Sequence, residues 1–154
     1  MYNTVNGFFE YVRHTRQRVN DLKEEISMIE ADTSFLRSSG VGGLGVQNNS
    51  QKDLSDCLVR LETKKETALH LISKNLALRE EGKRLIGVLD YTPWKSVLFH
   101  RYILGEPWET VMEKVGYSGT SVWAISRKAQ RKIERSKEWQ ELKERMERER
   151  AAGR

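Results

Sequence analysis

A regular spacing of mostly apolar side chains near the start of the chain constrains its fold more than any other feature. The gaps are 3, 4, 3, 4, 3, 4 and 3 residues, over Val5, Phe8, Val12, Thr15, Val19, Leu22, Ile26 and Ile29. Such a repeat places all of these side chains on one face of a helix, in the pattern of a coiled coil. The sequence therefore predicts a long helix over about residues 4–36, with Asn3 or Thr4 as its N-cap.

A second long helix is predicted over about residues 52–90. Its apolar stripe comprises Leu54, Leu58, Leu61, Ala68, Leu71, Ile72, Leu78, Leu85 and Leu89. Lys65, Asn75 and Gly82 interrupt this stripe, so it is no uniform zipper. Joined by a flexible glycine-rich loop over 37–51, the two helices are expected to fold back as an antiparallel, coiled-coil-like hairpin. The same stripes could instead pair between two chains, and a homodimer through the long helices is the alternative.

The loop contains a segment that matches a nucleotide-binding pattern. The letters GVGGLG at 40–45 fit G-x-G-x-x-G, which binds a dinucleotide when a strand precedes it and a helix opens on its third glycine. Here a helical heptad precedes the glycines and polar residues follow them, so a flexible connector is expected. No segment alternates apolar and polar residues over the length of a strand, and the predicted fold class is all-α.

Charge is divided unevenly along the chain. Residues 1–90 carry 13 Lys/Arg and 13 Asp/Glu, whereas residues 91–154 carry 14 and 9, so the whole excess of +5 lies in the C-terminal part. An excess of this kind indicates where a polyanion would bind.

The C-terminal part repeats a pattern of helix starts and stops. Thr92 with Pro93 and then Pro107 are typical helix starts, and Gly105 and Gly116 are typical stops. Two short helices followed by a longer one, with glycine between them, are typical of a helix-turn-helix. We expect this domain over 91–137, after a hairpin domain over 1–90 and before a charged helical tail over 138–154.

The third helix of this unit, capped by Ser118, has two contrasting faces. The packing face is apolar and comprises Val122, Ile125, Ala129 and Ile133. The opposite face carries Thr120, Ala124, Arg127 and Arg131, with Ser121, Trp123 and Lys128 beside it. Small residues in the first turn allow close approach to base edges, and the basic residues that follow can neutralise phosphates.

The segment from Val97 to Ile133 resembles the C-terminal helix-turn-helix, region 4, of bacterial sigma factors, which binds promoter DNA. The resemblance covers about a quarter of the chain. The matching residues are Arg101, Tyr102, Gly105, Trp108, Glu109, Val111, Gly116, Tyr117, Ser118, Val122, Ile125, Ala129, Arg131 and Lys132. As a whole the chain resembles small sigma-like regulators of phages and prophages, among them the ArpU and RinA groups of late-gene regulators.

This resemblance implies double-stranded DNA and bacterial RNA polymerase as partners. The DNA-binding residues expected from it and from the helix pattern are Ser118, Gly119, Thr120, Ser121, Trp123, Ala124, Arg127, Lys128 and Arg131. Sigma factors usually place Arg, Glu or Gln at the positions that read bases, so the target sequence does not carry over. Residues 1–90 lack a recognisable promoter-melting domain, and an activator or accessory factor is therefore expected rather than a complete sigma factor.

Other features narrow the function class. The three histidines and single cysteine, Cys57, suggest no metal site, and Cys57 is expected to be a small buried apolar residue. No nucleophile with an adjacent base and no paired carboxylates argue for catalysis, so neither enzyme activity nor a cofactor is predicted. In the tail, Trp139, Leu142 and Met146 form a stripe expected to dock on the hairpin or on a partner.

No apolar run reaches the length of a membrane span, and the N-terminus has no apolar signal core, so a cytoplasmic protein is expected. Two further functions stay open. One is a small terminase-type DNA-packaging subunit, which would form a ring. The other is a helical scaffold that binds protein only.

Overall fold

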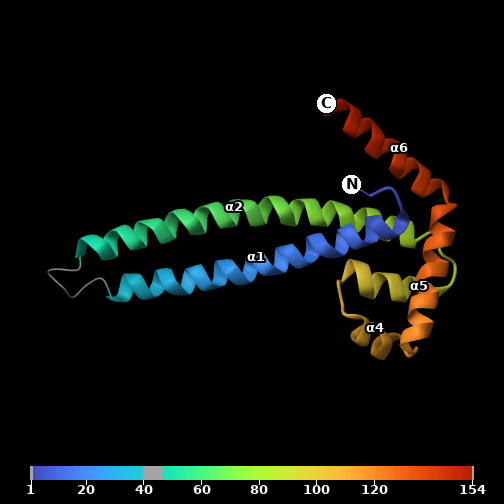
Figure 1. Cartoon of the computed structure of the whole chain (residues 1–154), viewed down its shortest axis with the longest axis horizontal. Helices are drawn as coiled ribbons and strands as arrows, with labels where there is room; N and C mark the ends of the chain where they lie inside the picture. Colours follow the sequence, from blue (N-terminus) through green and yellow to red (C-terminus); the bar gives the residue numbers. More distant parts are fainter. Residues whose placement is uncertain (1, 40–46, 154) are drawn as a thin grey trace. The chain divides into compact units, whose positions relative to one another are not determined.

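The computed structural model describes residues 2–39 and 47–153, and over these residues the chain is helical without any strand. The elements are α1 (Val5–Ser39), α2 (Gln47–Ile86), α3 (Thr92–Leu98), the π-helical turn η1 (Phe99–Ile103), α4 (Trp108–Val115), α5 (Gly119–Glu134) and α6 (Lys137–Ala152) (Figure 1). The all-α prediction is confirmed. The segment GVGGLG lies outside the described residues, while the described flanks of the expected loop, 37–39 and 47–51, are helical.

The chain divides into two compact units, and the division cuts both long helices. One unit comprises Met1–Arg16 with Asn75–Arg154, and the other comprises Gln17–Lys74. The domain boundaries expected near residues 90 and 137 stay predictions.

The unit Gln17–Lys74 consists of α1 from Gln17 onward and α2 up to Lys74, which lie side by side and run in opposite directions (Figure 1). Val19, Ala68 and Leu71 are buried, together with Thr33, whose hydroxyl donates to the carbonyl of Ile29. Ion pairs flank the apolar stripe, from Lys64 to Glu25 at 3.1 Å and from Lys65 to Glu30 at 3.3 Å. Lys65 therefore lies at the edge of the stripe. Two expectations fail here, because Leu58 is exposed and Cys57 is only half-buried.

The other unit has a core to which α1, α2, α3, η1, α5 and α6 all contribute. Phe8 and Phe9 are fully buried at its centre, with ring centroids 5.5 Å apart. Trp139 of α6 is 1% exposed and lies 6.3 Å from the Phe8 ring, with Leu142 buried beside it. The tail stripe thus packs on residues of α1. Docking on the helices of the N-terminal part was one of the two possibilities expected from the sequence.

Two residues expected to interrupt the α2 stripe lie buried within it. The Asn75 amide donates to the carbonyl of Val12 at 3.3 Å, which satisfies a polar group that burial would otherwise penalise. Gly82 lies against η1, where a Cβ atom would stand 2.7 Å from Cδ1 of Ile103 and 3.7 Å from the Phe9 ring. Glycine is needed here because its missing side chain lets η1 approach α2 closely.

Replacing Gly82 by leucine is expected to lower the free energy of unfolding by about 1–3 kcal/mol, because the added side chain overpacks a filled core. Urea denaturation followed by circular dichroism measures this. Ala77→Leu is the matched control, since Ala77 is exposed on the same helix and its replacement should change stability by less than about 0.5 kcal/mol. Equal stability of the two variants would contradict the close approach at Gly82.

Helix ends follow the sequence signals in part. The Thr4 hydroxyl accepts from the Gly7 amide at 3.0 Å, so Thr4 caps α1. Thr92 does not cap α3; it lies inside that helix, and Tyr91 takes the extended cap position without a side-chain bond. Gly116 ends α4 with a φ of 75°, a left-handed conformation that favours glycine. Within the described part of the chain, no helix is both long and apolar enough to cross a membrane.

Candidate nucleic-acid interface

Three short helices form a small core of their own within the larger unit. Val97 of α3, Val111 of α4 and Val122 of α5 are all fully buried. Five half-buried side chains pack around them: Trp108, Met112, Val115, Tyr117 and Ile125. This core fixes α5 against α3 and α4.

The connection between α4 and α5 is tight. Gly116 turns the chain, and α5 begins at Gly119, where a Cβ atom would stand 3.2 Å from Sδ of Met112. Ser118 holds the N-cap position with an extended backbone, but its hydroxyl donates to Oγ of Ser121 at 3.0 Å. The expected side-chain cap is therefore absent.

The turn before α4 is braced by charged side chains. The Glu106 carboxylate lies 3.1 Å from Nδ1 of His100 and accepts from Nζ of Lys114. Arg101 donates to the carbonyl of Glu106 at 3.1 Å, and its guanidinium lies 4.6 Å from the ring centroid of Trp108. Burial, with repulsion from Arg13, lowers the pKa of the Arg101 guanidinium. These contacts hold Trp108 at the start of α4.

The two faces of α5 differ as the sequence predicts. Val122, Ala129 and Ile133 are fully buried, and Ile125 is half-buried against the small core. On the other side Trp123 is 53% exposed. The nine predicted DNA-binding residues lie together on one turn and one helix: Ser118, Thr120, Trp123, Arg127, Lys128 and Arg131 are exposed, and Gly119, Ser121 and Ala124 are half-buried.

The basic residues of α5 are largely free of acidic neighbours. Lys132 lies 3.4 Å from the Asp90 carboxylate. Across the described residues, no ion pair involves Arg127, Lys128 or Arg131. Arg127 and Lys128 on one turn, and Arg131 on the next, are thus exposed to solvent without an ion-pair partner among the described residues.

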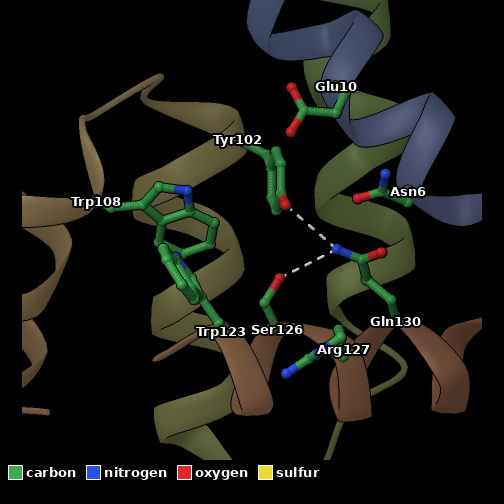
Figure 2. Close-up of a pocket in the computed structure, with 8 residues that line it drawn as sticks. All are labelled: Asn6, Glu10, Tyr102, Trp108, Trp123, Ser126, Arg127 and Gln130. Carbon is green, nitrogen blue, oxygen red and sulfur yellow. Dashed lines mark hydrogen bonds between the residues drawn. The ribbon is translucent and has the colours of Figure 1, made fainter. Parts of the chain in front are cut away.

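A pocket of about 300 Å³ opens beside this face. Figure 2 shows the residues that line it, namely Asn6, Glu10, Tyr102, Trp108, Trp123, Ser126, Arg127 and Gln130. The Gln130 amide donates to the Tyr102 hydroxyl at 3.3 Å and to Oγ of Ser126 at 3.1 Å. Burial raises the pKa of Tyr102, so its phenol stays protonated.

No family model, curated protein or solved structure matches the chain. Among the described residues, no three His, Cys, Asp or Glu side chains gather as a metal site would require. The exposed face of α5 offers cations, and the pocket offers aromatic rings, amides and the Glu10 carboxylate. Cations suit an anionic ligand, and aromatic rings with polar groups suit a heteroaromatic one.

Six residues of the pocket were not predicted from the sequence. Ser126 and Gln130 follow Trp123 at spacings of three and seven residues, and this helical periodicity could have placed them on the same face. Asn6 and Glu10 lie about 120 residues earlier in the chain, and no local pattern connects them to α5.

Proposed function

We propose that the protein is a sequence-specific, double-stranded DNA-binding transcription regulator of the phage or prophage type, acting with bacterial RNA polymerase as an activator. In this proposal α4 and α5 form a helix-turn-helix like region 4 of sigma factors, and α1 and α2 form a coiled-coil-like hairpin. The observation that carries the proposal is the exposed, unpaired basic face of α5.

The alternative to a DNA-binding face is an ordinary solvated surface, and the one-sided charge of α5 argues against it, since Gly119–Glu134 carries four Lys/Arg and one Glu. Some basic side chains elsewhere lie close to acids, as Lys64 does to Glu25 and Arg145 to Glu81, at 3.1 and 2.9 Å. On α5, Lys132 has such a partner in Asp90, whereas Arg127, Lys128 and Arg131 have none among the described residues. Like charges grouped on one exposed face repel one another, and DNA phosphates relieve this repulsion with release of counterions.

The first turns of α5 suit an approach to base edges. Gly119, Thr120 and Ser121 are small, so the helix could enter a major groove without steric hindrance. Trp123 offers a large apolar surface that could pack on a thymine methyl group or on the sugar-phosphate backbone. Arg127, Lys128 and Arg131 would then lie over the phosphates that flank the groove.

Selection of bound fragments from a sheared pool of phage and host genomic DNA, at physiological salt, tests this function. We expect enrichment of one short motif upstream of genes, because base contacts add specificity to the phosphate contacts. A matched selection without protein removes sequences that amplify by chance. Absence of any enriched motif, also when RNA polymerase is added, would contradict the proposal. Enrichment at a single packaging locus by a ring of many subunits would indicate a terminase-type protein instead.

A further inference from the structure

The pocket beside α5 has walls made of three aromatic rings. The Tyr102 ring is 2% exposed, and it meets the Trp108 ring edge-on with centroids 6.3 Å apart. The Arg101 guanidinium lies over Trp108 and helps to fix it. Trp123, in contrast, is 53% exposed. The half-buried Trp108 ring and the exposed Trp123 ring therefore offer the surface for stacking.

The remaining lining is polar and can both donate and accept. Figure 2 shows Trp108 and Trp123 on one side of Tyr102 and Gln130 on the other, with the Glu10 carboxylate extending toward Tyr102. Glu10 and the Asn6 amide can accept, while the Arg127 guanidinium and the hydroxyl groups of Ser126 and Tyr102 can donate. A planar ligand with polar atoms around its edge would satisfy both the rings and these groups.

We propose that this pocket binds a nucleobase, stacked on its tryptophans and donating from an exocyclic amino group to the Glu10 carboxylate. As a site for a base displaced from DNA, it rests on the function proposed above. A volume of about 300 Å³ lies at the lower end for ligand pockets, which fits one base rather than a larger cofactor.

The charge distribution favours a base over a phosphate in this pocket. Glu10 is an acid whose Oε2 lies 3.0 Å from Nε of Arg13 and 3.7 Å from Nε2 of His14, so Oε1 is the oxygen that can accept from a ligand in the pocket. A carboxylate repels a phosphate but accepts well from the amino group of adenine, cytosine or guanine. The phosphate attached to such a base would lie outward, toward Arg127, whose side chain is exposed at the pocket mouth.

The base could come from a free nucleotide or from a DNA strand. Trp123 and Arg127 belong both to the pocket and to the exposed face of α5, so a base leaving a duplex bound there has a short path. Unpairing costs least for a base that has no partner, and such a base should be captured preferentially.

Two binding assays on the full chain distinguish these sources. The first follows quenching of tryptophan fluorescence by the four deoxynucleoside monophosphates. The second compares, by fluorescence anisotropy, a duplex with one unpaired adenine and the same duplex fully paired. Each assay uses the natural chain, Glu10→Ala, and the control Glu24→Ala, which removes the same charge from an exposed position on α1. Circular dichroism checks that both variants keep their helix content.

We expect saturable binding in at least one assay, with thymidine monophosphate weakest among the free nucleotides. Glu10→Ala should weaken base binding about tenfold, because a charge-assisted hydrogen bond is lost, whereas Glu24→Ala should not. Affinity for the fully paired duplex should not fall in Glu10→Ala, because removal of an acid cannot weaken phosphate binding.

The two proposals fail in different ways. Salt-dependent binding of the paired duplex, without nucleotide binding and without preference for the unpaired adenine, would overturn the nucleobase site and leave DNA binding intact. Equal base binding by Glu10→Ala and the natural chain would also overturn it. Nucleotide binding that depends on Glu10, without any duplex binding, would support the pocket and contradict the DNA-binding function.

Discussion

Replacing Trp139 by alanine is expected to lower the free energy of unfolding by about 3–5 kcal/mol, the usual cost of truncating a fully buried aromatic residue. Trp139 is 1% exposed and contacts the Phe8 ring, and Leu142 is buried next to it. The neighbouring side chains relax only partly into the space that the indole leaves, so the cost of a cavity adds to the lost burial.

Urea denaturation followed by circular dichroism measures this loss. The control is Trp123→Ala, which removes the same side chain from an exposed position and should cost less than about 1 kcal/mol. The two variants also separate packing from binding, since Trp123→Ala is expected to weaken DNA binding in a chain that stays folded. A Trp139→Ala variant as stable as Trp123→Ala would show that α6 does not dock on the α1 residues in solution.

The sequence predicted the packing faces of the helices because helical periodicity is a local property. The heptad from Val5 to Val19 is buried as expected, and so are Val122, Ala129 and Ile133 on α5. The tail stripe of Trp139 and Leu142 was also correct, since spacing alone placed both on one side. In each case the residues that decide burial lie within a few turns of one another.

Contacts between distant segments could not be predicted in this way. Gly82 looked like a break in the α2 stripe, yet it is buried because Ile103, about 20 residues later, fills the space of a side chain. Asn75 is likewise buried, satisfied by a carbonyl of α1. The break between α5 and α6 depends on Ser136, whose hydroxyl accepts from the Trp139 amide at 3.2 Å. A serine between two charged residues permits a continuous helix equally well. Only the packing of Trp139 therefore decides that the helix breaks at Ser136.

The candidate site shows the same limit. The exposed face of α5 was identified from its spacing and its one-sided charge, and the structure places its residues together. The pocket beside this face was not predicted from the sequence, because Glu10 and Asn6 lie near α5 only when α1 packs on the C-terminal helices. Acidic and amide residues on a long surface helix are usually solvated, and nothing in their neighbourhood in the sequence distinguishes these two.

Removing three cations from α5 is expected to have the largest effect on function. The triple variant Arg127→Ala, Lys128→Ala, Arg131→Ala should bind duplex DNA roughly a hundredfold more weakly at physiological salt, because each phosphate contact releases about one counterion. The slope of log affinity against log salt should become shallower by about three units for the same reason. Alanine favours helix, and the three side chains are exposed and form no ion pair among the described residues, so folding should be retained.

The matched control removes three exposed cations from α1 and α2. It is the triple variant Arg18→Ala, Lys23→Ala, Lys52→Ala. Both triple variants lower the net charge from +5 by three units to +2, so any general effect of charge on DNA binding is the same in both. Titrations of one labelled duplex at several salt concentrations give affinity and slope together. If DNA lies on α5, only the first variant loses both. Equal losses of affinity in the two variants would mean that the chain binds DNA through its overall charge. Unchanged affinity in both variants would contradict DNA binding by α5 and would favour an acidic protein as the partner of this helix.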